Sequence, residues 1–206
     1  ALAAIGSDTG GSVRIPAAFC GLVGFKPTAR RISRAGVFSL STSLDSIGPI
    51  AASVPCCRIL DAILASAPGT FKANPAKRPK IGIPSNFLTA DLDDEVQIAF
   101  ARACERLSYG ADLIETSLPS LEIAADIGIL GGFSQIEGAR DHAELFARVG
   151  RACDPRVMDR FDAGSRIDRQ DYLRMIELRT QMINRFREET AHLDVIAYPR
   201  VAMIPP

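Results

Sequence analysis

The sequence contains no tryptophan, and aromatic residues make up only 6% of its 206 positions. Proteins that bind single-stranded nucleic acid stack bases on aromatic side chains, so this scarcity argues against such a surface. Neither sign of charge is in excess, because 24 basic side chains balance 24 acidic ones. Without a basic surface to attract phosphates, we expect no direct nucleic-acid binding and no attachment to an anionic membrane.

Metal-ligand and disulfide patterns are also lacking. The two histidines, His142 and His192, are far apart and do not have the spacing of a metal site. The five cysteines are odd in number and include no C-x-x-C pair, which argues against a disulfide framework and for a reducing compartment. No uncharged apolar run approaches the roughly 20 residues of a membrane span, and no signal peptide is visible. We therefore expect a cytoplasmic protein without a metal site.

The most informative stretch runs from Gly6 to Pro16. Its first seven residues hold three glycines and three hydroxyl side chains. Glycine permits positive φ and close approach of other groups, and successive amides of such a turn can converge on an anion. A serine at the end of the turn would be presented to a substrate beside an oxyanion hole. A plain turn uses the same residue types, whereas a nucleotide phosphate-binding loop is disfavoured because Ser12 stands where its lysine is required.

Residues 6–28 as a whole resemble the core motif of the amidase signature family, and the resemblance continues in residues 33–37 and 43–50. That family hydrolyses amides with a Ser–cis-Ser–Lys triad. The resemblance implies that Ser12 is the nucleophile and that no metal or organic cofactor is needed. It also implies an oxyanion hole formed by four successive backbone amides, those of Thr9, Gly10, Gly11 and Ser12.

The same resemblance assigns a supporting role to a charged pair and points to missing parts. Asp8 and Arg14 correspond to the pair that braces the loop. The cis-serine and the lysine of the family lie upstream of the motif, and this chain begins at Ala1, too late to contain either. We therefore expect a fragment of a longer protein that is inactive in isolation.

Three functions remain open at this point. The first is hydrolysis of the C–N bond of a small-molecule carboxylic amide through a serine acyl-enzyme. The second is the role of the glutamyl-tRNA(Gln) amidotransferase component that shares the motif and works with partner subunits. The third is a non-catalytic structural fragment. A homodimer or a complex with partner subunits is compatible with the sequence.

The predicted fold is α/β, a mixed central β-sheet flanked by helices on both faces, as in an incomplete amidase signature domain. Residues 1–206 are expected to form the central-to-C-terminal part of one domain, with a flexible boundary at 67–80, which is rich in proline and lysine. Apolar periodicity predicts strands and helices at the following positions. The strands are 1–5, 22–25, 80–84, 111–115 and 195–197, and the clearest helices are 54–65, 91–109 and 168–192. Strands 80–84 and 111–115, joined by a helix, are expected to be parallel neighbours.

Two further polar residues could be catalytic but have simpler interpretations. Lys26 precedes a proline at a strand end, so we expect it to be structural rather than a general base. Asp45 lies beside a turn, where a single carboxylate usually accepts hydrogen bonds from the local backbone.

Overall fold

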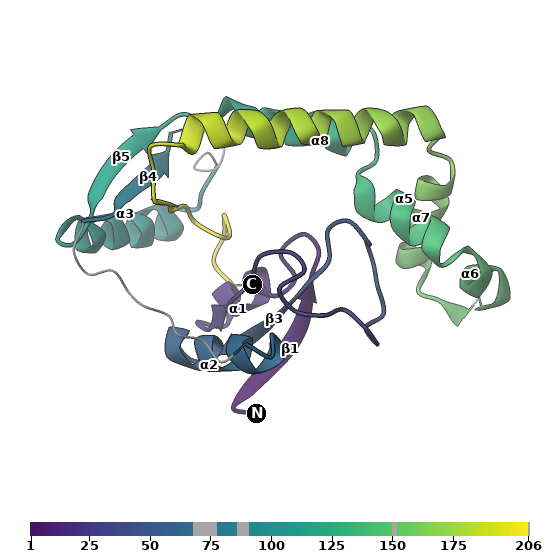
Figure 1. The fold of residues 1–206 in the computed structure, drawn as a ribbon, viewed down its shortest axis with the longest axis horizontal. Coiled ribbons are helices and arrows are strands. Elements are labelled where there is room, and N and C mark those ends of the chain that lie inside the picture. Colours follow the sequence, from purple (N-terminus) through teal and green to yellow (C-terminus); the bar gives the residue numbers. More distant parts are fainter. Residues whose placement is uncertain (68–77, 86–90, 150–151, 206) are drawn as a thin grey trace.

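The computed structural model describes residues 1–67, 78–85, 91–149 and 152–205. In these residues the strands form two three-stranded sheets, and long helical segments connect and flank them (Figure 1). The predicted α/β class is confirmed, with the strands divided between an antiparallel and a parallel sheet rather than gathered in one. Most of the predicted boundary, residues 68–77, lies outside the described residues.

The first sheet carries the glycine-rich motif at one strand end. Strand β3 (Ser46–Ala51) lies between β1 (Ala3–Asp8) and β2 (Val23–Gly24) and is antiparallel to both. The register pairs Asp8 with Ser46, so the end of β1 is held against the start of β3. Helix α1 (Arg14–Phe19) follows the motif, and α2 (Val54–Leu64) packs on β3, as the apolar stripe of residues 54–65 predicts.

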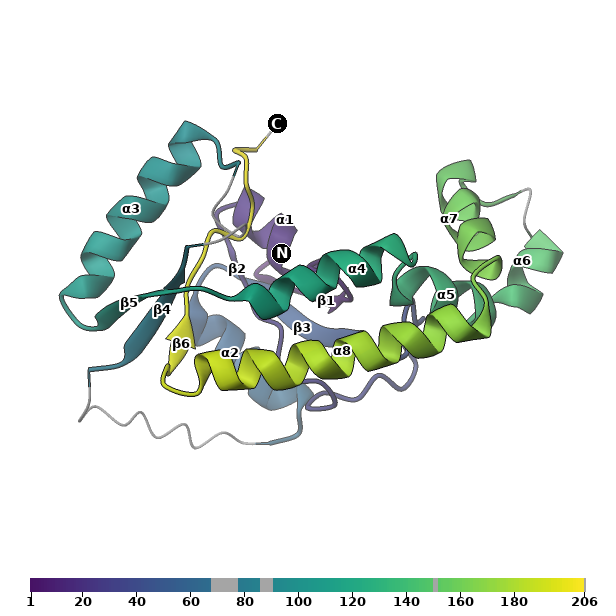
Figure 2. The same ribbon diagram turned by 90° about the horizontal axis from the view of Figure 1, so that it is seen from above.

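The second sheet is parallel and joins distant parts of the chain. Strand β4 (Lys80–Pro84) lies between β5 (Asp112–Thr116) and β6 (Val195–Ile196). Helix α3 (Asp94–Ser108) connects β4 to β5, so the predicted strand–helix–strand unit is confirmed. Because β6 pairs with β4, residues near the end of the given sequence lie beside a strand from a much earlier part of it (Figure 2).

The remaining elements are helical and end in one long helix, α8 (Arg169–Thr190). The others are η2 (Pro119–Glu122), α4 (Ile123–Ile129), α5 (Phe133–Asp141), α6 (Ala143–Val149) and α7 (Pro155–Ser165). Asp168 caps α8, since its Oδ1 accepts a hydrogen bond of 2.8 Å from the Asp171 amide. Such a cap stabilises a helix by about 1 kcal/mol.

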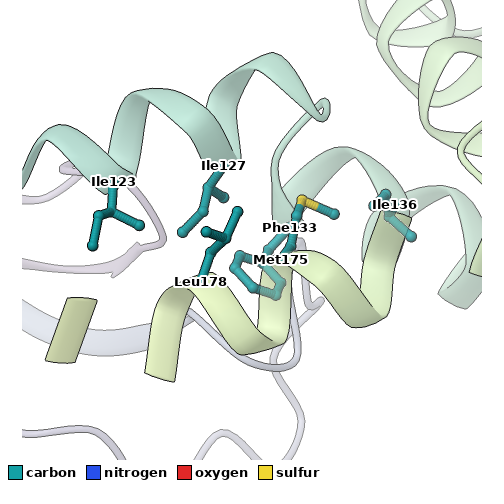
Figure 3. Close-up of a cluster of buried hydrophobic side chains, with 6 residues drawn as sticks. All are labelled: Ile123, Ile127, Phe133, Ile136, Met175 and Leu178. Carbon is teal, nitrogen blue, oxygen red and sulfur yellow. The ribbon is translucent and has the colours of Figure 1, made fainter. Parts of the chain in front are cut away.

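A compact apolar cluster joins α4, α5 and α8 (Figure 3). Its buried members are Ile123, Ile127, Phe133, Ile136, Met175 and Leu178. Met175 is fully buried, and truncation of such a side chain to alanine typically costs about 2–5 kcal/mol. This packing fixes α5 and α8 relative to each other, and Glu137 of α5 and Arg179 of α8 both form hydrogen bonds with Ser43, in the loop that precedes β3.

Candidate active site

Ser12 lies in the turn between β1 and α1. The strand ends at Asp8 and the helix begins at Arg14, so five residues form the connection. Gly11 has φ of +131°, a conformation that side chains with a Cβ rarely adopt, and its carbonyl accepts a 2.7 Å hydrogen bond from the Ile15 amide. The chain therefore bends sharply just before Ser12, and Ser12 itself is exposed.

The turn is braced from inside by an ion pair. Asp8 is fully buried, and Arg14 donates to both of its carboxylate oxygens at 2.9 Å, from Nε to Oδ2 and from Nη2 to Oδ1. The Gly11 amide donates to Oδ1 at 2.7 Å and the Val13 amide to Oδ2 at 3.3 Å. Burial acts to raise the pKa of Asp8, but Arg14 and the two amides outweigh it and hold the pKa below its usual range. Asp8 is therefore held as a carboxylate that accepts four hydrogen bonds.

These contacts distinguish one of the four backbone amides that are predicted to bind the oxyanion from the other three. The Gly11 N–H is directed at Asp8 and is already used inside the turn. Thr9, Gly10 and Ser12 lie in the same short connection between strand and helix. Their amides are the ones that can serve a ligand without breaking the bond between Gly11 and Asp8.

A second carboxylate, Asp45, holds the other side of the turn. The Thr9 hydroxyl donates to Asp45 Oδ1 at 2.5 Å. Asp45 Oδ2 accepts from the amides of Leu40 at 2.9 Å and Ser41 at 3.1 Å, so the predicted bonding to local backbone is confirmed. Burial acts to raise the pKa of Asp45, but the hydrogen bonds from Thr9 and from residues 39–41 outweigh it and lower the pKa.

The loop that contains Asp45 is in turn attached to the helical part by Glu137 of α5. This side chain is fully buried. It accepts hydrogen bonds from the Ser41 hydroxyl, from the Ser43 amide at 3.0 Å and from the Tyr172 hydroxyl of α8 at 2.9 Å. Burial acts to raise the pKa of Glu137, but these bonds outweigh it and lower the pKa. A continuous polar path thus leads from the helical core through Asp45 to Thr9.

The amine of Lys26 takes part in a local hydrogen bond. Its Nζ donates to the backbone oxygen of Pro27 at 3.2 Å. This local bond supports the structural interpretation of Lys26.

One residue at the turn was missed by sequence reasoning. Arg200 belongs to the segment after β6, which crosses from the second sheet toward α1 (Figure 1). Its Nη2 donates to the Gly10 carbonyl at 3.1 Å, although the two residues are 190 positions apart. Nothing in the local sequence around Arg200 resembles a site motif, so only the fold reveals this contact.

A large cavity lies away from the Ser12 turn. A cavity of about 600 Å³ is bounded by α5, α7 and α8, and its lining includes Arg140, Asp168 and Tyr172 but no residue of the Ser12 turn. A smaller one of about 210 Å³ lies beside Asp45. Among the residues that the structure describes, no cluster of three potential metal ligands occurs. No helix in the described ranges is long and apolar enough to cross a membrane.

Comparison with known proteins places the chain in a family. The sequence profile of the family named Amidase matches residues 1–206. The chain therefore belongs to the amidase family, as the glycine-rich turn and the α/β fold around it lead one to expect.

Two similar sequences carry the same name, that of one component of glutamyl-tRNA(Gln) amidotransferase. The protein from Ruminiclostridium cellulolyticum is 31% identical over 237 residues, with 97% of this chain and 49% of that protein covered. The protein from Moorella thermoacetica is 43% identical over 136 residues, with 59% of this chain and 28% of that protein covered. The chain spans at most about half the length of these relatives.

Solved structures share the fold. A crystal structure described as an amidase is 32% identical with a TM-score of 0.90, covering 100% of this chain and 46% of that one. The glutamyl-tRNA(Gln) amidotransferase component of the same name from Thermotoga maritima is 25% identical with a TM-score of 0.74, covering 98% of this chain and 47% of that one. The arrangement of the two small sheets and their helices is thus that of the amidase signature fold.

Proposed function

We propose that this chain provides the nucleophile and the oxyanion-binding turn of an enzyme that hydrolyses carboxylic amides. The observation that carries the proposal is the exposed Ser12 at the end of a turn that is braced by Asp8 and Arg14. Membership of the amidase family supports the same reaction class. Five cysteines present as free thiols support a reducing, cytoplasmic setting.

In the proposed reaction, Ser12 Oγ attacks the carbonyl carbon of the amide and loses its proton to a general base. The amides of Thr9, Gly10 and Ser12 stabilise the negative charge that develops on the carbonyl oxygen. Gly11 shapes the turn and keeps its own N–H on Asp8. The C–N bond then breaks, the nitrogen leaves with a proton as ammonia or an amine, and water hydrolyses the Ser12 ester to release the carboxylic acid.

The proton acceptor in this proposal is the serine–lysine pair that the family resemblance implies upstream of the motif. The 206-residue chain alone is therefore expected to be inactive. Steady amide hydrolysis by this chain in isolation, abolished by Ser12→Ala, would contradict that part of the proposal.

A fluorophosphonate probe tests the nucleophile directly, because it reacts with activated serine hydroxyls. The full-length protein is expected to be labelled, and Ser12→Ala is expected to abolish labelling. Ser7→Ala provides a matched control, because Ser7 is also an exposed serine but lies on β1, before the turn. This substitution should leave labelling unchanged. Labelling that survives Ser12→Ala would remove Ser12 from the role.

A second function is favoured by the names of the similar sequences. As one component of a glutamyl-tRNA(Gln) amidotransferase, the protein would release ammonia from glutamine and act within a complex. Purification from its source with partner subunits, and hydrolysis of glutamine in preference to other amides, would support this function. A monomer that hydrolyses simple amides and ignores glutamine would support the amidase function, and a protein with neither activity would support a structural role.

A further inference from the structure

We propose that Arg200 is a specificity residue that selects amides whose acyl group carries a carboxylate. This inference rests on the proposed function of Ser12 and adds a substrate class to it. The substrate would be a short monoamide of a dicarboxylic acid, with its amide carbonyl at Ser12 and its free carboxylate on the guanidinium of Arg200.

The position of Arg200 is the first reason. Its Nη2 bonds to the Gly10 carbonyl and lies only 1.8 Å from where a Cβ on Gly11 would stand. The guanidinium therefore occupies the space that the missing side chain of Gly11 leaves open. Because consecutive Cα atoms are about 3.8 Å apart, Nη2 lies within about 7 Å of the Ser12 Cα. A carboxylate about one to three carbons from the amide carbonyl fits this separation.

The charge balance of the turn is the second reason. The turn is flanked by two arginines, of which Arg14 is neutralised by Asp8. Arg200 takes part in no ion pair among the described residues. The site thus carries one uncompensated positive charge next to the nucleophile, and a partly buried charge is stabilised by a partner of opposite sign.

The hydrogen-bond inventory of Arg200 points the same way. Its Nε is buried and has no hydrogen-bond partner within the described part of the chain. One N–H of Nη2 is used on Gly10, so Nη1 and the second N–H of Nη2 remain for a ligand. The side chain as a whole is only half-buried, so its outer edge is accessible. Two parallel N–H groups of a guanidinium match the two oxygens of a carboxylate.

The segment that carries Arg200 is anchored on both sides, so the guanidinium is held in place. Before it, β6 pairs with β4 in the second sheet. After it, the Ala202 carbonyl accepts from the Asp93 amide at 2.8 Å, and the Ile204 amide donates to Asp93 Oδ2 at 3.2 Å. A fixed cation loses less conformational entropy on binding than a free surface arginine does.

The test compares charged and neutral amides of equal length on the full-length protein. The pairs are succinamate with succinamide and glutaramate with glutaramide. The wild-type protein is expected to have the higher kcat/KM for the charged member of at least one pair. Arg200→Gln is expected to lower kcat/KM for that anion by about 10- to 100-fold, mainly through KM, and to change the neutral diamide less than about threefold. Arg174→Gln is the control. It removes one exposed positive charge, that of the Arg174–Glu177 ion pair on α8, and should leave the preference for the charged amide unchanged.

Two results would overturn the inference. Equal losses for charged and neutral amides in Arg200→Gln would mean that Arg200 only holds the turn through Gly10. A wild-type protein without preference for the charged amides would exclude the substrate class, even if Arg200→Gln does not fold. Arg200→Lys, which keeps the charge but not the two-pronged donor, is expected to retain part of the preference.

Binding measurements separate this inference from the function on which it rests. Succinate and glutarate, the products of the two charged amides, are titrated calorimetrically into Ser12→Ala with and without Arg200→Gln. Binding of either product that requires Arg200 supports the inference even if no amide is hydrolysed, in which case the proposed function fails alone. Amide hydrolysis that requires Ser12, with no binding of either product that depends on Arg200, leaves the proposed function standing and refutes the inference.

Discussion

Asp8→Asn is the most informative single change at the turn, because the substitution keeps the shape of the side chain and removes its charge. All four groups around Asp8 are donors: two from Arg14 and one each from Gly11 and Val13. Asparagine offers one acceptor oxygen and one NH2 group, so its NH2 must face a donor. The change therefore weakens the charge-assisted bonds and also introduces a repulsive contact in a fully buried position.

The expected cost follows from the burial of the pair. Breaking a buried ion pair typically costs about 3–5 kcal/mol, and Arg14 is 31% exposed, so we expect a loss of about 2–3 kcal/mol in the free energy of unfolding. For a chain of this size that corresponds to a decrease of about 4–12 °C in Tm. Urea unfolding measures the loss, and the rate of fluorophosphonate labelling of Ser12 should fall with it because the turn loses its brace.

Two controls make the measurement specific. Asp112→Asn removes an exposed ion pair with Arg78 and should cost less than about 1 kcal/mol. Arg14→Gln and the double variant with Asp8→Asn complete a cycle, in which we expect a coupling energy of about 1–3 kcal/mol. A loss below about 0.5 kcal/mol for Asp8→Asn, or strictly additive single changes, would refute the reasoning about the brace.

The pH dependence of the free energy of unfolding provides an independent test of the Asp8 carboxylate. Because the pKa of folded Asp8 lies below its unfolded value, its contribution is present above the unfolded pKa of about 3.9 and is lost as the pH falls toward the folded pKa. Asp8→Asn should therefore flatten the loss of stability below about pH 4, and an unchanged acid profile would contradict this prediction.

Three further changes test the rest of the site. Thr9→Val removes the hydroxyl that donates to Asp45 and should lower the free energy of unfolding by about 1.5–3 kcal/mol. Urea unfolding measures this loss, and an unchanged midpoint would argue against the contact. Gly11→Ala should lower the free energy of unfolding by more than about 1 kcal/mol, because Gly11 has φ of +131° and a Cβ there would meet Arg200. Gly10→Ala should cost less, because a Cβ at Gly10 would meet nothing within 4 Å. Equal costs of the two substitutions would contradict the proposed crowding at Gly11. Glu137→Gln should lower Tm by several degrees through its contacts with the loop containing Asp45, and a thermal scan that matches wild type would remove Glu137 from that role.

Local signals predicted part of the secondary structure, but β3, the central strand of the first sheet, was not among the predicted strands. The apolar stripe of 54–65 and the capping residue Asp168 correspond to α2 and α8, and the pairing of β4 with β5 follows from the helix between them. These features depend on residues close together in sequence, so periodicity and capping chemistry can identify them.

Long-range features were not predictable in the same way. The strands 1–5 and 80–84 are similarly apolar, yet they belong to different sheets, because strand pairing depends on partners far away in sequence. Ile5 on β1 is 60% exposed, so an apolar side chain in a predicted strand does not by itself mark a core position. The contacts of Thr9 with Asp45 and of Glu137 with Ser41 join residues 36 and 96 positions apart, and no local pattern encodes them.

The contact between Gly10 and Arg200 also has a consequence for biosynthesis. A ribosome adds about 5–20 residues per second, so the 190 positions between these two residues require on the order of 10–40 s of translation. During that interval the nascent chain already contains Ser12 but not the guanidinium beside it. The turn can therefore acquire its neighbouring cation only after the 190 positions that separate Gly10 from Arg200 have been translated, so the nucleophile is synthesised well before its surroundings are complete.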